Sequence, residues 1–221
     1  MRLHIVSIVV FLSATTTAFA QNSIYVDWGV TLGVSLTQLQ FKDKNGSQST
    51  AAALSFDRSI DLTGGLFAEI KFTKHRWLSM RNELTHRKYD GESSDYYQGV
   101  GQTHAFGSVS AGYLKYSLSF RAALTKTSLR PFVGAGISPS LLLLQENHYL
   151  IDYGVTQQRQ PLLTNVKSFE FGYFGSVGVM YNRFTGEVRV EMSNGLRPAG
   201  LSSPVNTIYI LLSYRLLEGE Q

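Results

Sequence analysis

The feature that most constrains this chain is a strict alternation of apolar and polar residues over residues 24–36. Successive side chains of a β-strand point to opposite faces, whereas apolar residues on one face of a helix recur every three or four positions. The alternation therefore predicts a strand with one apolar and one polar face. Its apolar positions are Ile24, Val26, Trp28, Val30, Leu32, Val34 and Leu36.

The same pattern recurs along the chain and predicts eight strands. Residues 60–72, 169–181, 184–192 and 207–216 alternate clearly, and residues 77–89, 104–120 and 131–144 do so less regularly. The parity changes near Gly112, which predicts a β-bulge, and Pro139 predicts a bulge or a strand end because proline lacks the N–H donor. The fold predicted is all-β, an eight-stranded antiparallel up-and-down transmembrane β-barrel.

The connections between these strands alternate in length. Residues 42–59, 90–103, 145–167 and 194–206 form long polar connections, and residues 73–76, 121–130 and 182–183 form shorter ones. Long outer loops and short periplasmic turns are typical of outer-membrane barrels, and an even strand number places both termini in the periplasm.

The first twenty residues resemble an export signal. Arg2 precedes an apolar stretch at residues 5–14, and Ala18-Phe19-Ala20 provides a small-x-small cleavage site. We expect residues 1–20 to be a signal peptide and residues 21–221 to be the outer-membrane barrel domain. An uncleaved anchor is the alternative, although this stretch is shorter than the roughly 20 residues that a membrane-spanning helix needs.

Composition excludes several classes of protein. There is no cysteine, which excludes disulfides, thiolate metal sites, a cysteine nucleophile and a lipid-modified N-terminal cysteine. The net charge is only +4 and the basic residues are scattered, so nucleic acid is not an expected partner. Beyond residue 20 no apolar run is long enough for a membrane helix, so a membrane-spanning chain must close as a barrel.

Alternation alone does not say which face points inward, and a soluble periplasmic barrel that binds an apolar ligand is the alternative. The polar face is rich in glycine, which suits the narrow interior of an eight-stranded barrel. Aromatic residues near the predicted strand ends suit the two interfaces of a membrane. The inward glycines are Gly29, Gly33, Gly65, Gly134, Gly136, Gly172 and Gly178, and the aromatic positions are Phe41, Trp77, Tyr89, Tyr116, Phe120, Tyr149, Tyr181 and Tyr214.

With the apolar face outward, ten charged residues point into the lumen. Charges of both signs in a narrow interior should pair, because an isolated buried charge costs several kcal/mol. We interpret them as a polar plug, with a proton or ion path as the alternative; an open channel is not expected, because eight strands leave little lumen. The residues are Asp27, Glu69, Lys71, Arg81, Glu83, Glu170, Glu187, Arg189, Glu191 and Arg215.

Three short runs resemble strands three to five of the PorT-like outer-membrane β-barrel proteins of Bacteroidota. They are Ser79-Met80-Arg81-Asn82-Glu83-Leu84 with Tyr89-Asp90-Gly91, Tyr113-Leu114-Lys115-Tyr116, and Arg130-Pro131-Phe132-Val133-Gly134-Ala135-Gly136. The resemblance implies an eight-stranded outer-membrane barrel, usually without an assigned activity, and for the namesake a part in protein secretion. The chain departs from the family pattern at Gly112-Tyr113 and in its polar C-terminal tail.

We expect no catalytic, cofactor-binding or metal-binding residues. The histidines are dispersed, at His4, His75, His86, His104 and His148, without the spacing of a zinc site. A lipid-modifying enzyme, the alternative function, would need a serine activated by a histidine: His86 with Ser93 or Ser94, or His104 with Ser108.

The function expected is a non-enzymatic role in the cell envelope: structural, secretion-associated or surface-binding. The partners expected are outer-membrane lipid and lipopolysaccharide, the barrel-insertion machinery during assembly, and possible protein partners at the outer loops or periplasmic turns. Aromatic and basic outer-loop residues suit partner recognition, packing against lipopolysaccharide or packing among themselves; they are Tyr96, Tyr97, Tyr149, Tyr153 and Arg159.

Overall fold

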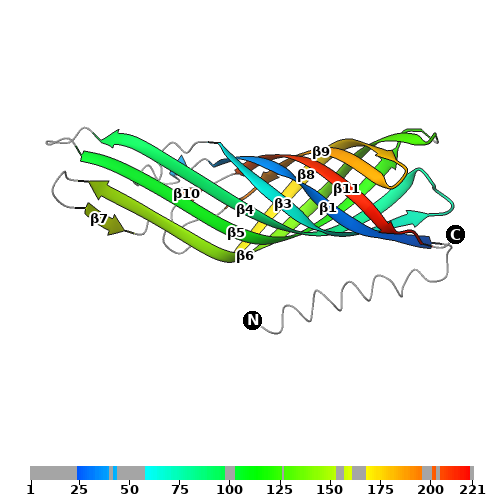
Figure 1. Cartoon of the computed structure of the whole chain (residues 1–221), viewed down its shortest axis with the longest axis horizontal. Helices are drawn as coiled ribbons and strands as arrows, with labels where there is room; N and C mark the ends of the chain where they lie inside the picture. The colour runs from blue at the N-terminus through cyan, green and yellow to red at the C-terminus, as the bar shows by residue number, and fades with distance from the viewer. Residues whose placement is uncertain are drawn as a thin grey trace.

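The structure, a computed structural model, is a closed antiparallel β-barrel (Figure 1). It describes residues 24–39, 42–43, 58–97, 103–125, 127–152, 157–160, 168–195, 201–202 and 205–219. The predicted signal peptide at residues 1–20 lies outside these ranges. Within them, no helix has the length and apolar character needed to cross a membrane.

Eight long strands form the barrel wall. They pair in the order β5-β4-β3-β1-β11-β9-β8-β6, and pairing of β5 with β6 closes the ring. All neighbouring pairs are antiparallel. The wall strands are β1 (Ile24–Leu39), β3 (Ser59–Phe72), β4 (Leu78–Tyr97), β5 (Thr103–Ala123), β6 (Leu129–Asp152), β8 (Phe169–Tyr181), β9 (Phe184–Ser193) and β11 (Val205–Leu217).

Three short strands lie outside the wall. β7 (Gln157–Gln160) pairs with the end of β6, and β2 (Lys42–Asp43) pairs with β10 (Leu201–Ser202). The predicted eight-stranded barrel is thus confirmed, and these short strands occupy parts of the predicted long connections.

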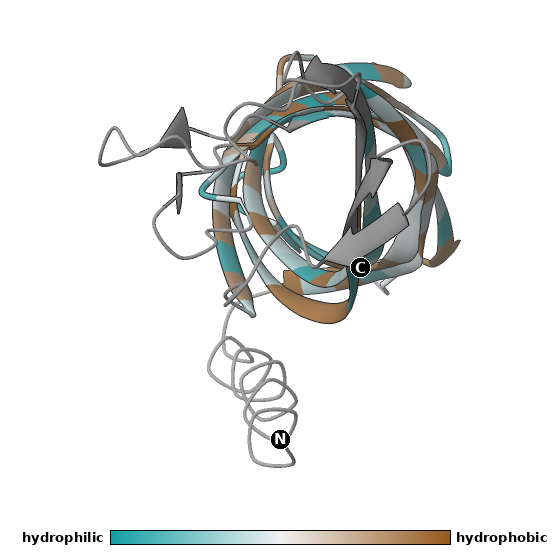
Figure 2. Ribbon diagram, turned by 90° about the vertical axis from the view of Figure 1, so that its left-hand side faces the viewer, coloured by the Kyte–Doolittle hydropathy of each residue, from teal (hydrophilic) through white to brown (hydrophobic). Residues whose placement is uncertain are grey.

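The apolar face of the wall points outward, as predicted. Leu32 and Leu62, for example, are 66% and 80% exposed, whereas their neighbours Thr31 and Asp61 are buried. Figure 2, a view along the barrel, shows hydrophobic and hydrophilic bands alternating along the strands. A soluble barrel with an apolar interior is therefore wrong for this chain, because water would face a wall of leucine, valine and phenylalanine.

The short turns and both ends of the wall lie at one end of the barrel. Phe72 pairs with Ile24, Leu129 pairs with Tyr181, and the Gly219 N–H donates to Asp27 Oδ1 at 3.2 Å. In outer-membrane barrels the end with short turns and both termini faces the periplasm. We call this end the periplasmic mouth.

Three adjacent strands are longer than predicted. β4, β5 and β6 have 20, 21 and 24 residues, whereas β8, β9 and β11 have 13, 10 and 13. The predicted loop at residues 90–103 is largely strand, since β4 reaches Tyr97 and β5 begins at Thr103. The predicted loop at 145–167 was likewise too long, because β6 continues to Asp152. We call residues 88–97 of β4, 103–112 of β5 and 142–152 of β6 the projecting wall. Figure 1 shows it extending past the other strands.

The two predicted irregularities have different outcomes. The register of β5 against β6 shifts between Gly112 and Tyr113, which confirms the bulge. Pro139 neither ends β6 nor shifts its register, because it continues the ladder opposite Phe171 on β8. The extra residue in β6 is instead Leu143, which the shift leaves unpaired with β5.

Several predicted interfacial aromatics face outward near strand ends. Trp77, Phe120 and Tyr181 are each about half exposed, and Tyr116 and Tyr214 are partly exposed. Phe41 lies outside the described residues, and nothing is described of the Tyr149 side chain. Tyr89 was predicted wrongly: it shares the inward parity of Arg87 and is completely buried in the lumen.

Candidate functional site

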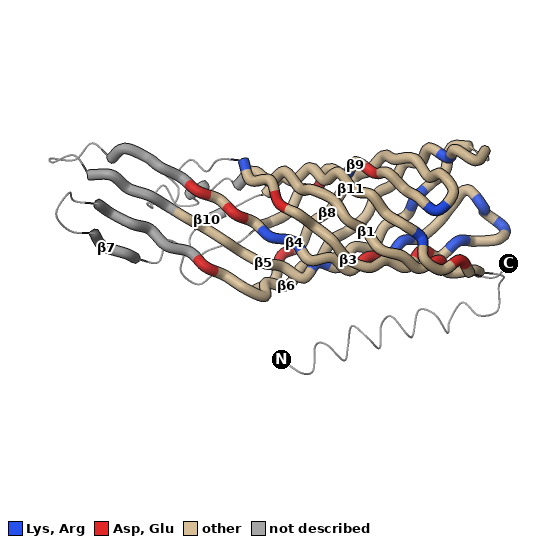
Figure 3. The backbone as a smooth tube through the Cα atoms, in the orientation of Figure 1, with Lys and Arg blue, Asp and Glu red and all other residues tan. Residues whose placement is uncertain are grey.

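The lumen is the most distinctive part of the protein, because charged side chains fill it. All ten predicted interior charges point inward: eight are buried, and Lys71 and Arg215 keep 17% and 19% of their side-chain surface. Figure 3 shows Lys and Arg close to Asp and Glu along the wall. The charges form three clusters, which we name from the periplasmic mouth outward.

The mouth cluster consists of Asp27, Lys71, Arg215 and Glu218. Lys71 Nζ lies 2.5 Å from Asp27 Oδ2, and Arg215 Nη1 lies 3.1 Å from the same oxygen and 2.8 Å from Glu218 Oε1. The four residues come from β1, β3, β11 and the residue just after β11. Two cations face two carboxylates, so the cluster is neutral.

The middle cluster contains three arginines and three glutamates. Arg189 bridges two carboxylates, with Nη2 at 2.9 Å from Glu83 Oε2 and Nε at 3.1 Å from Glu187 Oε1. Arg121 forms an ion pair with Glu187 and lies 3.9 Å from Glu69. The six residues, Glu69, Arg81, Glu83, Arg121, Glu187 and Arg189, come from β3, β4, β5 and β9.

Hydroxyl groups add hydrogen bonds to the middle cluster. Arg81 donates from Nη2 to Thr31 Oγ1 at 2.6 Å and to Ser213 Oγ at 2.7 Å, and Ser79 donates to Glu69 Oε1 at 2.6 Å. Buried charges are tolerated when they are both paired and hydrogen-bonded. Every charge of this cluster has an oppositely charged neighbour, but Arg81 Nε and Nη1, Glu83 Oε1, and Arg121 Nε and Nη1 are buried without a hydrogen-bond partner in the described part of the chain.

The upper cluster lies nearest the projecting wall. Arg87 contacts Glu191 at 2.8 Å and Glu170 at 3.2 Å, and Lys115 forms an ion pair with Glu191. Tyr89 donates to Glu170 at 3.0 Å, and Lys115 donates to the Tyr209 hydroxyl at 3.0 Å. Two cations again balance two carboxylates. Every cluster is therefore neutral by itself, which confirms the predicted pairing.

Inward glycines have a more specific role than small size. An added Cβ on Gly29 would meet the Phe67 ring at 2.6 Å, one on Gly178 would meet Phe132 at 2.6 Å, and one on Gly136 would meet Phe174 at 2.7 Å. Each glycine thus makes room for a ring from a neighbouring strand. A guanidinium lies over each ring: Arg81 over Phe67 at 3.7 Å, Arg121 over Phe132 at 4.7 Å and Arg189 over Phe174 at 4.3 Å.

Sequence reasoning missed three of the lumen cations, Arg87, Lys115 and Arg121. Arg121 was assigned to a turn, but β5 continues to Ala123 and buries it. The alternation of the strand faces would have identified Arg87 as an inward residue. Arg87 lies two and four residues beyond Thr85 and Glu83, on the same strand face.

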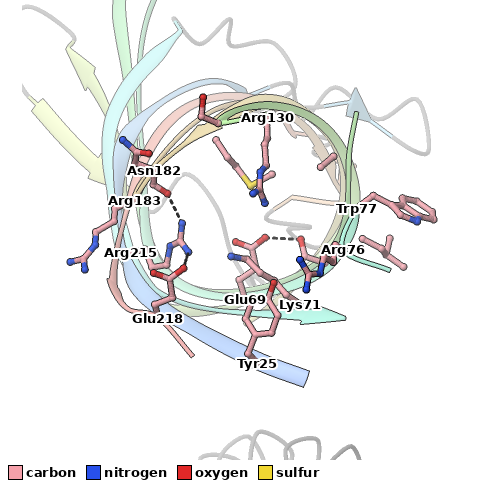
Figure 4. Close-up of a pocket in the computed structure, with 15 residues that line it drawn as sticks. Tyr25, Glu69, Lys71, Arg76, Trp77, Arg130, Asn182, Arg183, Arg215 and Glu218 are labelled. Atoms are coloured by element: carbon pink, nitrogen blue, oxygen red, sulfur yellow. Dashed lines mark hydrogen bonds and ion pairs between the residues drawn. The ribbon is translucent and has the colours of Figure 1, made fainter. Parts of the chain in front are cut away.

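A cavity of about 440 Å³ opens at the periplasmic mouth (Figure 4). Its lining comes from the three short turns, from the strand ends that border these turns and from the end of β11. Arg130 reaches into the cavity and Arg183 points away from it. The charged residues of the lining are Glu69, Lys71, Arg76, Arg130, Arg183, Arg215 and Glu218.

The histidine–serine pairs considered for an enzyme are held apart by the strands. His86 is exposed on β4, and Ser93 and Ser94 are seven and eight residues further along the same strand. At about 3.3 Å per residue, that is about 23 Å or more. His104 and Ser108 are four residues apart on β5, about 13 Å, which exceeds hydrogen-bond reach.

The histidines also fail to gather around a metal. His86 pairs with Leu114, ten residues along β5 from His104, so the two do not approach each other. No group of three or more metal-ligating side chains occurs within the described ranges. The buried charges of the described lumen are instead arranged in neutral, paired clusters.

The sequence matches the family described as "outer membrane protein beta-barrel domain" over residues 19–198. No curated protein matches it.

Among solved structures, the chain is similar to Neisserial surface protein A, with 9% identity, 86% of this chain and 97% of that chain covered and a TM-score of 0.40. It is similar to OprG of Pseudomonas aeruginosa, with 11% identity, 89% and 98% coverage and a TM-score of 0.43. It is also similar to Ail of Yersinia pestis, with 7% identity, 87% and 99% coverage and a TM-score of 0.35.

Proposed function

The chain belongs to the outer membrane protein β-barrel domain family, and from this membership we propose that it has a non-enzymatic, surface-binding role in the cell envelope. It is an outer-membrane protein, with its apolar wall in contact with membrane lipid. The proposal is that the projecting wall presents a rigid polar sheet to a partner outside the cell.

The observation that carries this proposal is the unequal height of the barrel. A transmembrane strand needs about 9–11 residues, which β9 just provides with its ten. β4, β5 and β6 exceed this by about ten residues each, or about 30 Å of strand. A membrane anchor alone does not need this extra length.

The two faces of the projecting wall suit such a role. Its inward face buries Tyr89, Val109 and Ala111 completely, which makes the sheet rigid. Its outward face carries exposed charges, including the ion pair between Lys88 Nζ and Asp90 Oδ2 at 2.5 Å. The outward face also exposes Leu143 and Leu144 on β6, so it offers a partner both charged and apolar surface, and a sheet that is already paired can bind at a small cost in ordering.

Shortening the projecting wall tests this role. Gly91 pairs with Val109, so residues 92–108 can be replaced by an Asn-Gly turn while the pairing below is kept. In a strain that lacks the protein, expression of the full chain should restore the wild-type envelope phenotype, whereas expression of the shortened chain should not. The matched control replaces only residues 98–102 with a flexible segment of equal length and should restore the phenotype. Heat-dependent gel mobility shows whether the shortened chain is folded. If the folded shortened chain restores the wild-type phenotype, the role lies elsewhere in the barrel.

The absence of enzymatic activity is part of the proposal. It is supported by the separation of His86 from the serines of β4 and by the pairing of the lumen charges. A His86→Ala, His104→Ala double variant should leave the lipid A profile unchanged. A changed profile would favour the lipid-modifying enzyme instead.

Three finer statements also belong to the proposal. Membership of the PorT-like group, and with it a link to secretion, rests on the short runs around Ser79, Tyr113 and Arg130. Removal of residues 1–20 as a signal peptide rests on Ala18-Phe19-Ala20, and N-terminal sequencing of the mature protein tests it. Recognition by the barrel-insertion machinery follows from the location of the protein.

A further inference from the structure

The cavity at the periplasmic mouth has an excess of cations that its carboxylates do not balance. Lys71 and Arg215 are neutralised within the mouth cluster by Asp27 and Glu218. Glu69 accepts from Ser79 and is oriented toward the middle cluster by Arg121.

Three cations that line the cavity, Arg76, Arg130 and Arg183, have no carboxylate partner among the described residues, and Arg183 points away from the cavity. Among the described residues, neither Arg76 nor Arg130 forms an ion pair, although both line the cavity. Arg130 uses only Nε, which donates to the Thr127 carbonyl at 3.2 Å. Its terminal nitrogens remain available where Figure 4 shows the side chain reaching into the mouth.

The arrangement differs from that of the lumen above it. The mouth, middle and upper clusters each balance cations with an equal number of carboxylates, whereas Arg76, Arg130 and Arg183 leave three positive charges at the entrance. The described charges around the outer end of the wall are largely acidic, including Asp61, Glu92 and Glu146, and Figure 3 shows Lys and Arg gathered at the opposite end. An anion approaching from the periplasm therefore meets a positive field.

We propose that the periplasmic mouth is a binding site for a phosphate group, held between Arg76 and Arg130. Arg76 lies in the turn between β3 and β4 and Arg130 is the second residue of β6, so they approach a ligand from two parts of the wall. Ser128 and Asn182 line the same cavity and add neutral donors. Guanidinium groups bind phosphate through two parallel hydrogen bonds, and a tetrahedral phosphate has more acceptor oxygens than a planar carboxylate for donors on several sides.

The test measures phosphate binding by isothermal titration calorimetry on the full barrel in neutral detergent. The soluble probe is inorganic phosphate and the lipid probe is dihexanoyl phosphatidylglycerol below its micelle concentration. Acetate is the carboxylate probe. Arg76→Gln and Arg130→Gln should each weaken phosphate binding by about tenfold or more, as expected for loss of a charge-assisted hydrogen bond.

Arg183→Gln is the matched control. Arg183 lines the same mouth but points away from the cavity, so its loss removes one charge without removing a proposed contact. Its affinity should stay within about twofold of the parent, as expected for a screened exposed charge. Heat-dependent gel mobility confirms that each variant is folded.

The outcomes separate the sources of the phosphate. Saturable binding of inorganic phosphate supports a soluble ligand, and binding of the phosphatidylglycerol alone supports a lipid headgroup; either supports the site if Arg76 and Arg130 are required. Equal losses in all three variants would overturn the proposal in favour of general charge attraction. Acetate binding as tight as phosphate, or no binding of either phosphate probe, would also overturn it.

Discussion

Removing one arginine from the middle cluster should destabilise the barrel far more than removing an exposed charge. Arg189 is 2% exposed and holds Glu83 at 2.9 Å and Glu187 at 3.1 Å. In Arg189→Met, three buried carboxylates would face only two arginines. Loss of one partner of a buried ion pair costs about 3–5 kcal/mol, because the remaining charge is left uncompensated.

A second substitution should recover much of this loss. Glu83 keeps only a weak contact with Arg81, at 3.7 Å, once Arg189 is gone. Glu83→Gln combined with Arg189→Met restores two cations against two carboxylates. We therefore expect the double variant to cost at least about 1.5 kcal/mol less than the sum of the two single variants, within the range of coupling energies of contacting residues.

The measurement is equilibrium unfolding in urea of the barrel refolded into lipid vesicles, followed by tryptophan fluorescence. Lys88→Met is the control, because it breaks an ion pair that is 50% and 44% exposed at its two ends; it should cost less than about 1 kcal/mol. The reasoning is refuted if Arg189→Met costs no more than Lys88→Met. It is also refuted if the costs of the two lumen substitutions simply add.

Three further predictions concern the wall and the lumen. Gly178→Ala should destabilise the barrel by about 1–3 kcal/mol because its Cβ would meet the Phe132 ring at 2.6 Å, whereas Gly175→Ala, with no atom within 4 Å, should be nearly neutral; urea unfolding of the two variants measures the difference. Val188→Lys, on the outward face midway along β9, should cost about 2–4 kcal/mol in vesicles, and a cost near zero would mean that this face does not contact hydrocarbon. The plugged lumen should give no steady single-channel conductance in planar bilayers, and regular conductance steps from the intact protein would refute the plug.

The orientation of side chains was the part of the fold that the sequence predicted best. Period-two parity correctly assigned Trp28 and Leu62 to the outer face and Asp27 and Glu187 to the lumen. Successive side chains of a strand point to opposite faces whichever strands it pairs with, so the local sequence is sufficient to predict which side chains share a face. The same parity, extended two and four residues beyond Thr85, would have assigned Arg87 and Tyr89 to the lumen.

Strand length was predicted less well. Asp90-Gly91-Glu92-Ser93 has the composition of a turn, yet it continues β4. The pairing of β4 with β5 continues through this segment, from Asp90 opposite Ser110 to Tyr97 opposite Thr103. Pairing with a neighbouring strand outweighs the local preference of these residues, and no short window of sequence contains that information.

The candidate site depends on the barrel as a whole. Arg87 and Glu191, whose contact anchors the upper cluster, are 104 residues apart. Alternation predicts that both point inward, but their relative height follows from the registers of four successive strand pairs. The pairing of charges was therefore predictable as a requirement, and the partner of each charge was not. Arg76 and Arg130 had no sequence signal at all, because their significance comes from the turns meeting at one mouth.

Because the ion pairs of the lumen join strands from different parts of the sequence, the full set of lumen charges is paired only when the barrel is closed. The middle cluster joins β3, β4 and β5 to β9, and the upper cluster joins β4 and β5 to β8 and β9. An open sheet that held only β1, β3, β4 and β5 would carry five lumen cations against three carboxylates, because Glu170, Glu187 and Glu191 would still be absent. The cations are Lys71, Arg81, Arg87, Lys115 and Arg121, and the carboxylates are Asp27, Glu69 and Glu83. Buried charges without partners cost several kcal/mol each, so such an intermediate is penalised in the membrane until β8 and β9 arrive. The charges that fill the lumen thus favour the closed barrel over its open precursors.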